Sequence, residues 1–141
     1  MIILDTNVVS ESLKPQCAEA VTAWLDSQVA ETLYLTAINA AELWSGVAVL
    51  PDGVRKATLE ASLEGLLARL FGSRRLDFDD QAARAYAQLI RRTYAAGTPL
   101  PLADGLIAAI ATVHGFAVAT RDVTPFRAAG LTVINPWDFA G

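Results

Sequence analysis

Short apolar segments alternate along this chain with longer segments whose apolar residues recur at helical spacing. Apolar runs of about four residues, bounded by polar turn residues, are typical of buried strands. The expected strands cover residues 1–4, 32–36, 75–78, 116–119 and 131–134. The expected helices cover 7–13, 18–26, about 37–49, 54–71, 80–97 and 103–114, with a further helical turn from 124. This alternation predicts an α/β fold, with a mostly parallel central sheet between two layers of helices.

The length of 141 residues suits one domain over residues 1–141 with a buried core. Hydrophobic residues make up 53% of the chain, which excludes a disordered protein. No apolar run approaches the ~20 residues that cross a membrane. No basic segment precedes an apolar one near Met1, so we expect a cytoplasmic protein with no membrane contact. Cys17 is the only cysteine, which excludes an internal disulfide and a Cys-rich metal site.

The net charge of −4 argues against broad affinity for nucleic acid, which usually shows as an excess of Lys and Arg. It does not exclude a nuclease, because carboxylates clustered in an active site can dominate the sum.

Four carboxylates stand alone in apolar surroundings. Asp5 is the only charged residue among the first ten, Glu42 the only one from 36 to 50, and Asp104 the only one from 93 to 113. Asp122 closely follows an apolar strand. An Asp can also cap a helix or form an ion pair, so each Asp has a purely structural explanation. Glu42 lies inside its helix, where capping does not explain it, and one shared site accounts for all four acids.

The predicted elements allow these four acids to meet. Asp5 and Asp122 follow strands, Glu42 comes six residues after a strand, and Asp104 begins the helix that leads to the strand before Asp122. In open parallel sheets, ligands bind outside the carboxyl ends of the strands. Two like charges ~4 Å apart repel by on the order of 4 kcal/mol at an effective dielectric of about 20. A hard divalent cation removes this cost, and oxygen ligands favour Mg²⁺ or Mn²⁺ over Zn²⁺.

Short motifs surround the acids in a fixed order. They are Ile-Leu-Asp-Thr-Asn at the N-terminus, Ala-Ala-Glu-Leu at Glu42, Leu-Ala-Asp-Gly-Leu-Ile-Ala-Ala at Asp104, and Ala-Thr-Arg-Asp ending at Asp122. The ordered set resembles the PIN-domain ribonucleases over the whole chain. The closing Val-Ile-Asn-Pro-Trp at 133–137 resembles the VapC and FitB-like toxin branch of that family.

The resemblance implies a PIN-like three-layer α/β/α sandwich and Mg²⁺-dependent hydrolysis of RNA phosphodiester bonds, with Mn²⁺ as an alternative ion. It implies that the catalytic residues are Asp5, Glu42, Asp104 and Asp122. Of these, Asp5 and Asp104 would hold the metal, and Thr6, Asn7 and Thr120 would orient the acids. It further implies a homodimer that is the toxin of a type II toxin–antitoxin system, blocked by a cognate antitoxin protein.

Other classes of protein stay open at this point. A non-catalytic PIN-like binding module would have lost an acid, and none is lost. A haloacid-dehalogenase-like phosphatase also begins with a strand and an Asp, but it needs a second Asp where this chain has Asn7. A receiver domain needs a Lys at the end of a late strand, and the only lysines here are Lys14 and Lys56.

Two further side-chain types near the motifs have alternative roles. Arg121 lies beside Asp122 and is expected either to contact a phosphate or to form a structural ion pair. Trp24, Trp44 and Trp137 are expected to pack in the core rather than to bind RNA bases.

Overall fold

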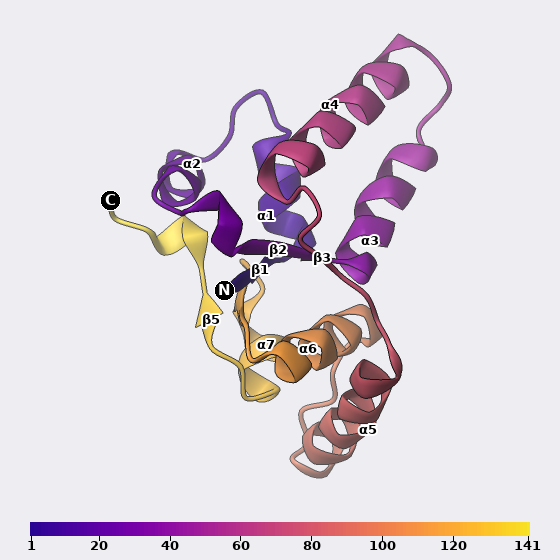
Figure 1. Cartoon of the computed structure of the whole chain (residues 1–141), viewed down its shortest axis with the longest axis vertical. Coiled ribbons are helices and arrows are strands. Elements are labelled where there is room, and N and C mark those ends of the chain that lie inside the picture. The colour runs from indigo at the N-terminus through magenta and orange to yellow at the C-terminus, as the bar shows by residue number, and fades with distance from the viewer.

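A five-stranded sheet forms the centre of the computed structural model, which describes all residues 1–141 (Figure 1). The strands are β1 (Ile2–Leu4), β2 (Leu33–Thr36), β3 (Arg75–Leu76), β4 (Ala117–Ala119) and β5 (Val133–Ile134). They are ordered β3-β2-β1-β4-β5, and every pairing is parallel. The predicted α/β class is confirmed, and the sheet is wholly rather than mostly parallel.

Helices cover both faces of this sheet. On one side lie α1 (Thr6–Ser12), α2 (Glu19–Asp26), α3 (Ala37–Ala48) and α4 (Val54–Leu70), and on the other α5 (Asp80–Ala95), α6 (Leu102–His114) and α7 (Val123–Ala128). In Figure 1 the first group lies above the sheet and the second below it. Two short 3-10 helices, η1 (Ala30–Thr32) and η2 (Pro136–Asp138), complete the chain. No helix is both long and apolar enough to cross a membrane.

The strands supply side chains to two separate cores. Leu4, Leu33 and Leu35 pack with the first group of helices, whereas Ile3 and Val118 pack with the second. Successive side chains of a strand point to opposite faces, so both faces of each central strand are apolar. A parallel sheet requires such cover on both sides. The predicted three-layer α/β/α arrangement is therefore confirmed.

Side-chain caps fix where two of the helices begin. The Thr36 hydroxyl accepts a hydrogen bond from the Asn39 N–H at 3.1 Å, which caps α3. The Asp79 carboxylate accepts one from the Ala82 N–H at 2.9 Å, which caps α5. Each cap occupies one of the free N–H groups that the first turn of a helix leaves without a partner.

The strand order places β1 and β4 side by side in the middle of the sheet. The chain builds outward from β1 through β2 to β3, then returns to β4 on the other side of β1 and ends at β5. Such a reversal opens a crevice at the carboxyl ends of the two adjacent strands. Leu4 and Ala119 are paired there, so Asp5 and Thr120 are the next residues along the two strands.

Candidate active site

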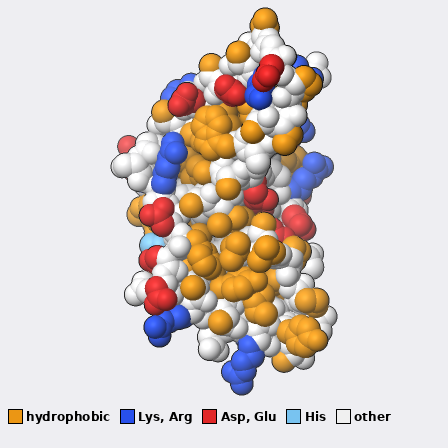
Figure 2. All heavy atoms as spheres, turned by 90° about the vertical axis from the view of Figure 1, so that its right-hand side faces the viewer, with side chains coloured by type: hydrophobic (Ala, Val, Ile, Leu, Met, Phe, Trp, Pro, Cys, Tyr) orange, Lys and Arg blue, Asp and Glu red, His pale blue; other side chains and the backbone are white.

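An open pocket at this edge of the sheet is lined by all four predicted acids. Asp5 follows β1, Glu42 lies in α3, Asp104 lies in the first turn of α6, and Asp122 precedes α7. The pocket has a volume of about 400 Å³ and is lined by polar or acidic residues only. Figure 2 shows acidic side chains near the middle of the face seen from the right of Figure 1, with a broad hydrophobic area below them.

Asp5 is held rigidly by hydrogen bonds. Its side chain is nearly buried, with 5% of the residue exposed. Oδ1 accepts from the Thr6 N–H at 2.8 Å and the Asn39 amide at 3.2 Å. Oδ2 accepts from the Thr120 hydroxyl at 2.8 Å and the Asn7 amide at 3.5 Å. Burial raises the pKa of the Asp5 carboxyl, and hydrogen bonds from Thr120, Thr6 and Asn39 oppose that rise.

The neighbouring polar residues link the acids to one another. The Thr6 hydroxyl donates to Oε1 of Glu42 at 2.7 Å. The Thr120 hydroxyl accepts from the Asp122 N–H at 3.0 Å while it donates to Asp5. The Asn7 amide donates to Thr120 as well, at 3.2 Å. All three residues named by the resemblance for orienting the acids therefore contact an acid or its backbone.

Asn39 is a site residue that the acid motifs in the sequence did not indicate. It is fully buried, and its amide donates both to Asp5 and to the Thr6 hydroxyl, the latter at 3.1 Å. The Thr36 hydroxyl donates to Asn39 Oδ1 at 2.6 Å, which turns the NH₂ group toward Asp5. A signal was available, because Asn39 precedes Glu42 by three residues and such residues share one face of a helix.

The surroundings of the Asp104 carboxylate differ from those of Asp5. It is half-buried and its carboxylate accepts no hydrogen bond from the protein. Desolvation, together with the negative charges of Asp5, Asp122 and Glu42, raises the pKa of Asp104 from 3.8 to about 6. None of the four acids forms an ion pair. The pocket thus concentrates negative charge that the protein leaves uncompensated.

This oxygen-only donor set fits a hard divalent cation. The carboxylates surround the pocket but do not form a preformed group of three ligands. Mg²⁺ does not require such a group, because it is usually held by one or two carboxylates and keeps several waters. Asp104 has both oxygens free, and the long contact between Asp5 and Asn7 is the weakest of the four bonds to Asp5. The residues present therefore match the chemistry of the predicted ion.

Arg121 forms no ion pair, so the structural alternative for this residue is not observed, and its contact with a phosphate stays a prediction. Its guanidinium lies 5.0 Å from the centroid of the Trp137 ring, where cation and ring attract each other. Trp24 is buried with 4% exposed, and Trp44 and Trp137 pack partly buried against the same core. The prediction that the three tryptophans belong to the core is confirmed.

The strand order and the acid pocket define a class of protein: a parallel α/β/α sandwich with a carboxylate cluster where the strand order reverses. The chain belongs to the PIN-domain family, whose profile matches residues 2–131. This membership sets aside the phosphatase and receiver-domain alternatives.

Close relatives share nearly the full length of the chain. The "VapC ribonuclease Y4jK" of Sinorhizobium fredii is 50% identical over 138 residues, which cover 98% of this chain and 99% of the relative. The "Toxin FitB" of Neisseria gonorrhoeae is 50% identical over 139 residues, which cover 97% and 99%. A solved structure of FitAB bound to the IR36 DNA fragment superposes with a TM-score of 0.94 at 46% identity, covering 100% of this chain and 99% of that one. The chain is thus similar to VapC and FitB-type proteins throughout.

Proposed function

We propose that this chain is a metal-dependent endoribonuclease and the toxin of a toxin–antitoxin pair. The observation that carries the proposal is the pocket lined by Asp5, Glu42, Asp104 and Asp122, in which no cation offsets the carboxylates. The names of the relatives, a ribonuclease and a toxin, support the same reading.

In this proposal Asp5 and Asp104 hold Mg²⁺ or Mn²⁺, and Glu42 and Asp122 complete the cluster. When bound, the ion would supply the positive charge that offsets the carboxylates and polarises water and phosphate for hydrolysis. Asp5 is the fixed ligand, because four donors set its orientation. Asp104 is the free ligand, because no protein donor competes for its oxygens.

The remaining polar residues do the positioning. Thr120 and Asn39 donate to Asp5 and so favour its ionised form. Thr6 holds one oxygen of Glu42 and leaves the other, Oε2, without a protein donor. Glu42 Oε2 can therefore accept a proton from the water that attacks the phosphodiester.

Cleavage of single-stranded RNA by the purified protein tests the proposal. We expect internal cleavage in Mg²⁺ or Mn²⁺, none in EDTA, and none by an Asp104→Asn variant. A protein that binds RNA but leaves it intact in either ion would be the non-catalytic binding module instead.

The proposal includes two protein partners. The first is a cognate antitoxin, which the resemblance implies and which we expect to copurify when both are expressed.

The second is another copy of the chain. Leu102 at the start of α6 is 67% exposed, and the hydrophobic area in Figure 2 would be covered in a homodimer. Sedimentation of the isolated protein measures this state directly.

A further inference from the structure

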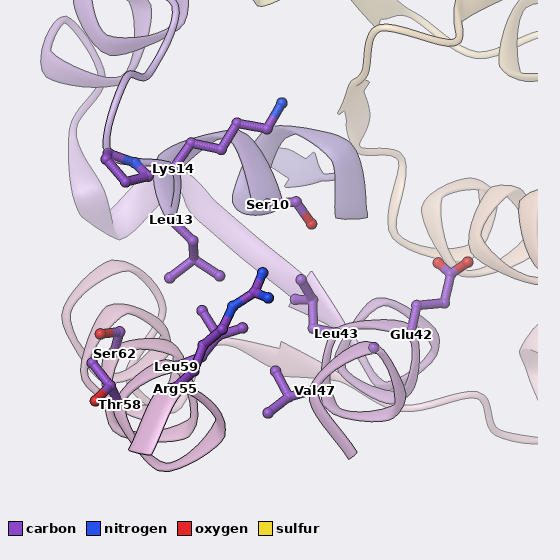
Figure 3. A pocket seen from close by; sticks show the side chains of 12 residues that line it. Ser10, Leu13, Lys14, Glu42, Leu43, Val47, Arg55, Thr58, Leu59 and Ser62 are labelled. Carbon is purple, nitrogen blue, oxygen red and sulfur yellow. The ribbon is translucent and has the colours of Figure 1, made fainter. Parts of the chain in front are cut away.

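A groove between α1, α3 and α4 is larger than the acid pocket that it adjoins. It has a volume of about 630 Å³. Figure 3 shows the end of α1 above it, α4 at its left and α3 at its right. Its floor is aliphatic and includes Leu13, Leu43 and Leu59, while the hydroxyls of Thr58 and Ser62 lie along its α4 side. The groove thus combines an apolar floor with hydroxyl groups that can form hydrogen bonds.

The groove lies next to the acid pocket. Ser10 of α1 and Glu42 of α3 line both hollows. A polymer whose reacting bond lies at the acids must extend beyond them, and this groove is an open path for its flanking residues.

One free cation points into the groove. The guanidinium of Arg55 extends from α4 into the space between Ser10 and Leu43 (Figure 3). Arg55 is exposed and forms no ion pair, whereas the ammonium of Lys14, the other cation, is paired with Glu11 at 3.0 Å. Glu42 at the pocket end is the only acid that lines the groove. The groove therefore offers a planar donor group to an anion, beside a pocket that repels anions.

We infer that this groove holds the single strand of RNA that flanks the scissile bond, with Arg55 bound to one of its phosphates. The inference rests on the proposed function and names the path of its substrate. The aliphatic floor then lies under the bases, and the absence of an aromatic side chain there predicts contact without stacking. Arg55 acts on the phosphate backbone, so it contributes affinity and little sequence preference.

The first test measures binding of single-stranded RNA oligonucleotides to Asp104→Asn protein in Mg²⁺ over a range of salt concentrations. Arg55→Gln in that background should weaken binding several-fold for RNAs of different sequence. It should also lower the slope of log K against log salt by about 0.7, the loss of one phosphate contact on a single strand. Arg69→Gln is the matched control, because Arg69 lies on the same helix outside the groove and carries the same charge. It should change neither quantity.

The second test measures cleavage of an RNA trimmed from either end toward its mapped cleavage site. Arg55→Gln should slow cleavage of the long RNA, mainly through KM, and should not affect the shortest RNA that is still cut. If Arg55→Gln and Arg69→Gln have the same RNA affinity, salt slope and cleavage rates, the inference is overturned. Cleavage by the wild type would still support the proposed function in that case. RNA binding that depends on Arg55, with no cleavage by the wild type, would support the groove as an RNA site and overturn the proposed function. Loss of a copurified partner protein on Arg55→Gln, with RNA binding unchanged, would make this a protein-docking groove and also overturn the inference.

Discussion

Asp5 and Asp104 line one pocket, but the protein treats their charges differently. Asp5 accepts four hydrogen bonds and Asp104 none, and the pKa of Asp104 rises from 3.8 to about 6 on folding. An acid whose pKa is higher in the folded protein favours folding below its unfolded value and loses that contribution as the pH rises through its folded value. The ionised Asp104 therefore destabilises the metal-free protein above about pH 6.

Asp104→Asn removes this charge and keeps the shape. In EDTA at pH 7.5 the variant should melt at or above the temperature of the wild type, and the difference should shrink as the pH falls from about 6 to about 4. With free Mg²⁺ ~100-fold above its dissociation constant, the wild type should gain about 2.7 kcal/mol, because the ion binds only the folded form. The variant should gain little and cleave nothing. Thermal melts across pH, with EDTA and with Mg²⁺, measure both effects.

The opposing view of Asp104 is that it only caps α6. Asn caps a helix about as well as Asp, so a pure cap would leave the Mg²⁺ response of the variant undiminished. A variant that keeps the full Mg²⁺ shift would remove Asp104 from the metal site.

Asn39→Ala deletes the buried amide that reaches Asp5 and Thr6. We expect a loss of about 1–3 kcal/mol in the free energy of unfolding, because buried polar groups lose their partner. Cleavage should fall as well, since one of the bonds that oppose the raised pKa of Asp5 is gone. Asn135→Ala is the control, because Asn135 caps η2 by accepting from the Trp137 N–H and lies outside the pocket. If Asn39→Ala matches the wild type in chemical unfolding and in cleavage rate, then Asn39 neither stabilises the fold nor supports the ionised form of Asp5.

At the scale of the elements, local chemistry predicted most boundaries and could not predict the sheet. Helices α3 and α5 begin directly after their capping residues Thr36 and Asp79, so the signals for these boundaries lie within a few residues. The edge strands β3 and β5 are shorter than the predicted 75–78 and 131–134, and each pairs along one side only. The order β3-β2-β1-β4-β5 depends on pairings between distant segments, which no local pattern specifies.

Helix α6 separates Asp104, near its start, from His114, its last residue. Ten residues at ~1.5 Å each place them roughly 15 Å apart. The His114 ring instead lies beside Phe116, at 5.3 Å between centroids. His114→Ala should therefore keep most of the cleavage activity, because the acid pocket contains no imidazole. A loss of more than about tenfold in a folded His114→Ala protein, measured beside Asp104→Asn, would contradict the mechanism.

At the scale of the whole molecule, the site joins residues from both ends of the chain. The sequence predicted the four acids because a lone charge in an apolar segment is visible locally. It could not reveal the role of Asn39, the stacking of Arg121 on Trp137, or the groove beside Glu42, because each depends on a neighbour supplied by the fold.

The toxin reading predicts an effect on the cell. Induced expression of the chain alone should arrest growth, and co-expression of its cognate antitoxin should relieve the arrest. Asp104→Asn, expressed to the same level, should be harmless because it cleaves no RNA. Colony counts after induction measure the effect. Normal growth with abundant, folded wild-type protein in a host that has no antitoxin would refute the toxin reading.

The hydrogen bond between Thr120 and Asp5 limits when the acid pocket can form during synthesis of the chain. It joins two residues that are 115 positions apart. Asp5 is therefore translated long before Thr120 and Asp122. A nascent chain therefore carries β1 before it carries β4, and the four carboxylates can come together only after Asp122 has been made. A chain truncated before β4 would lack Thr120 and Asp122 and could not form the complete four-acid pocket.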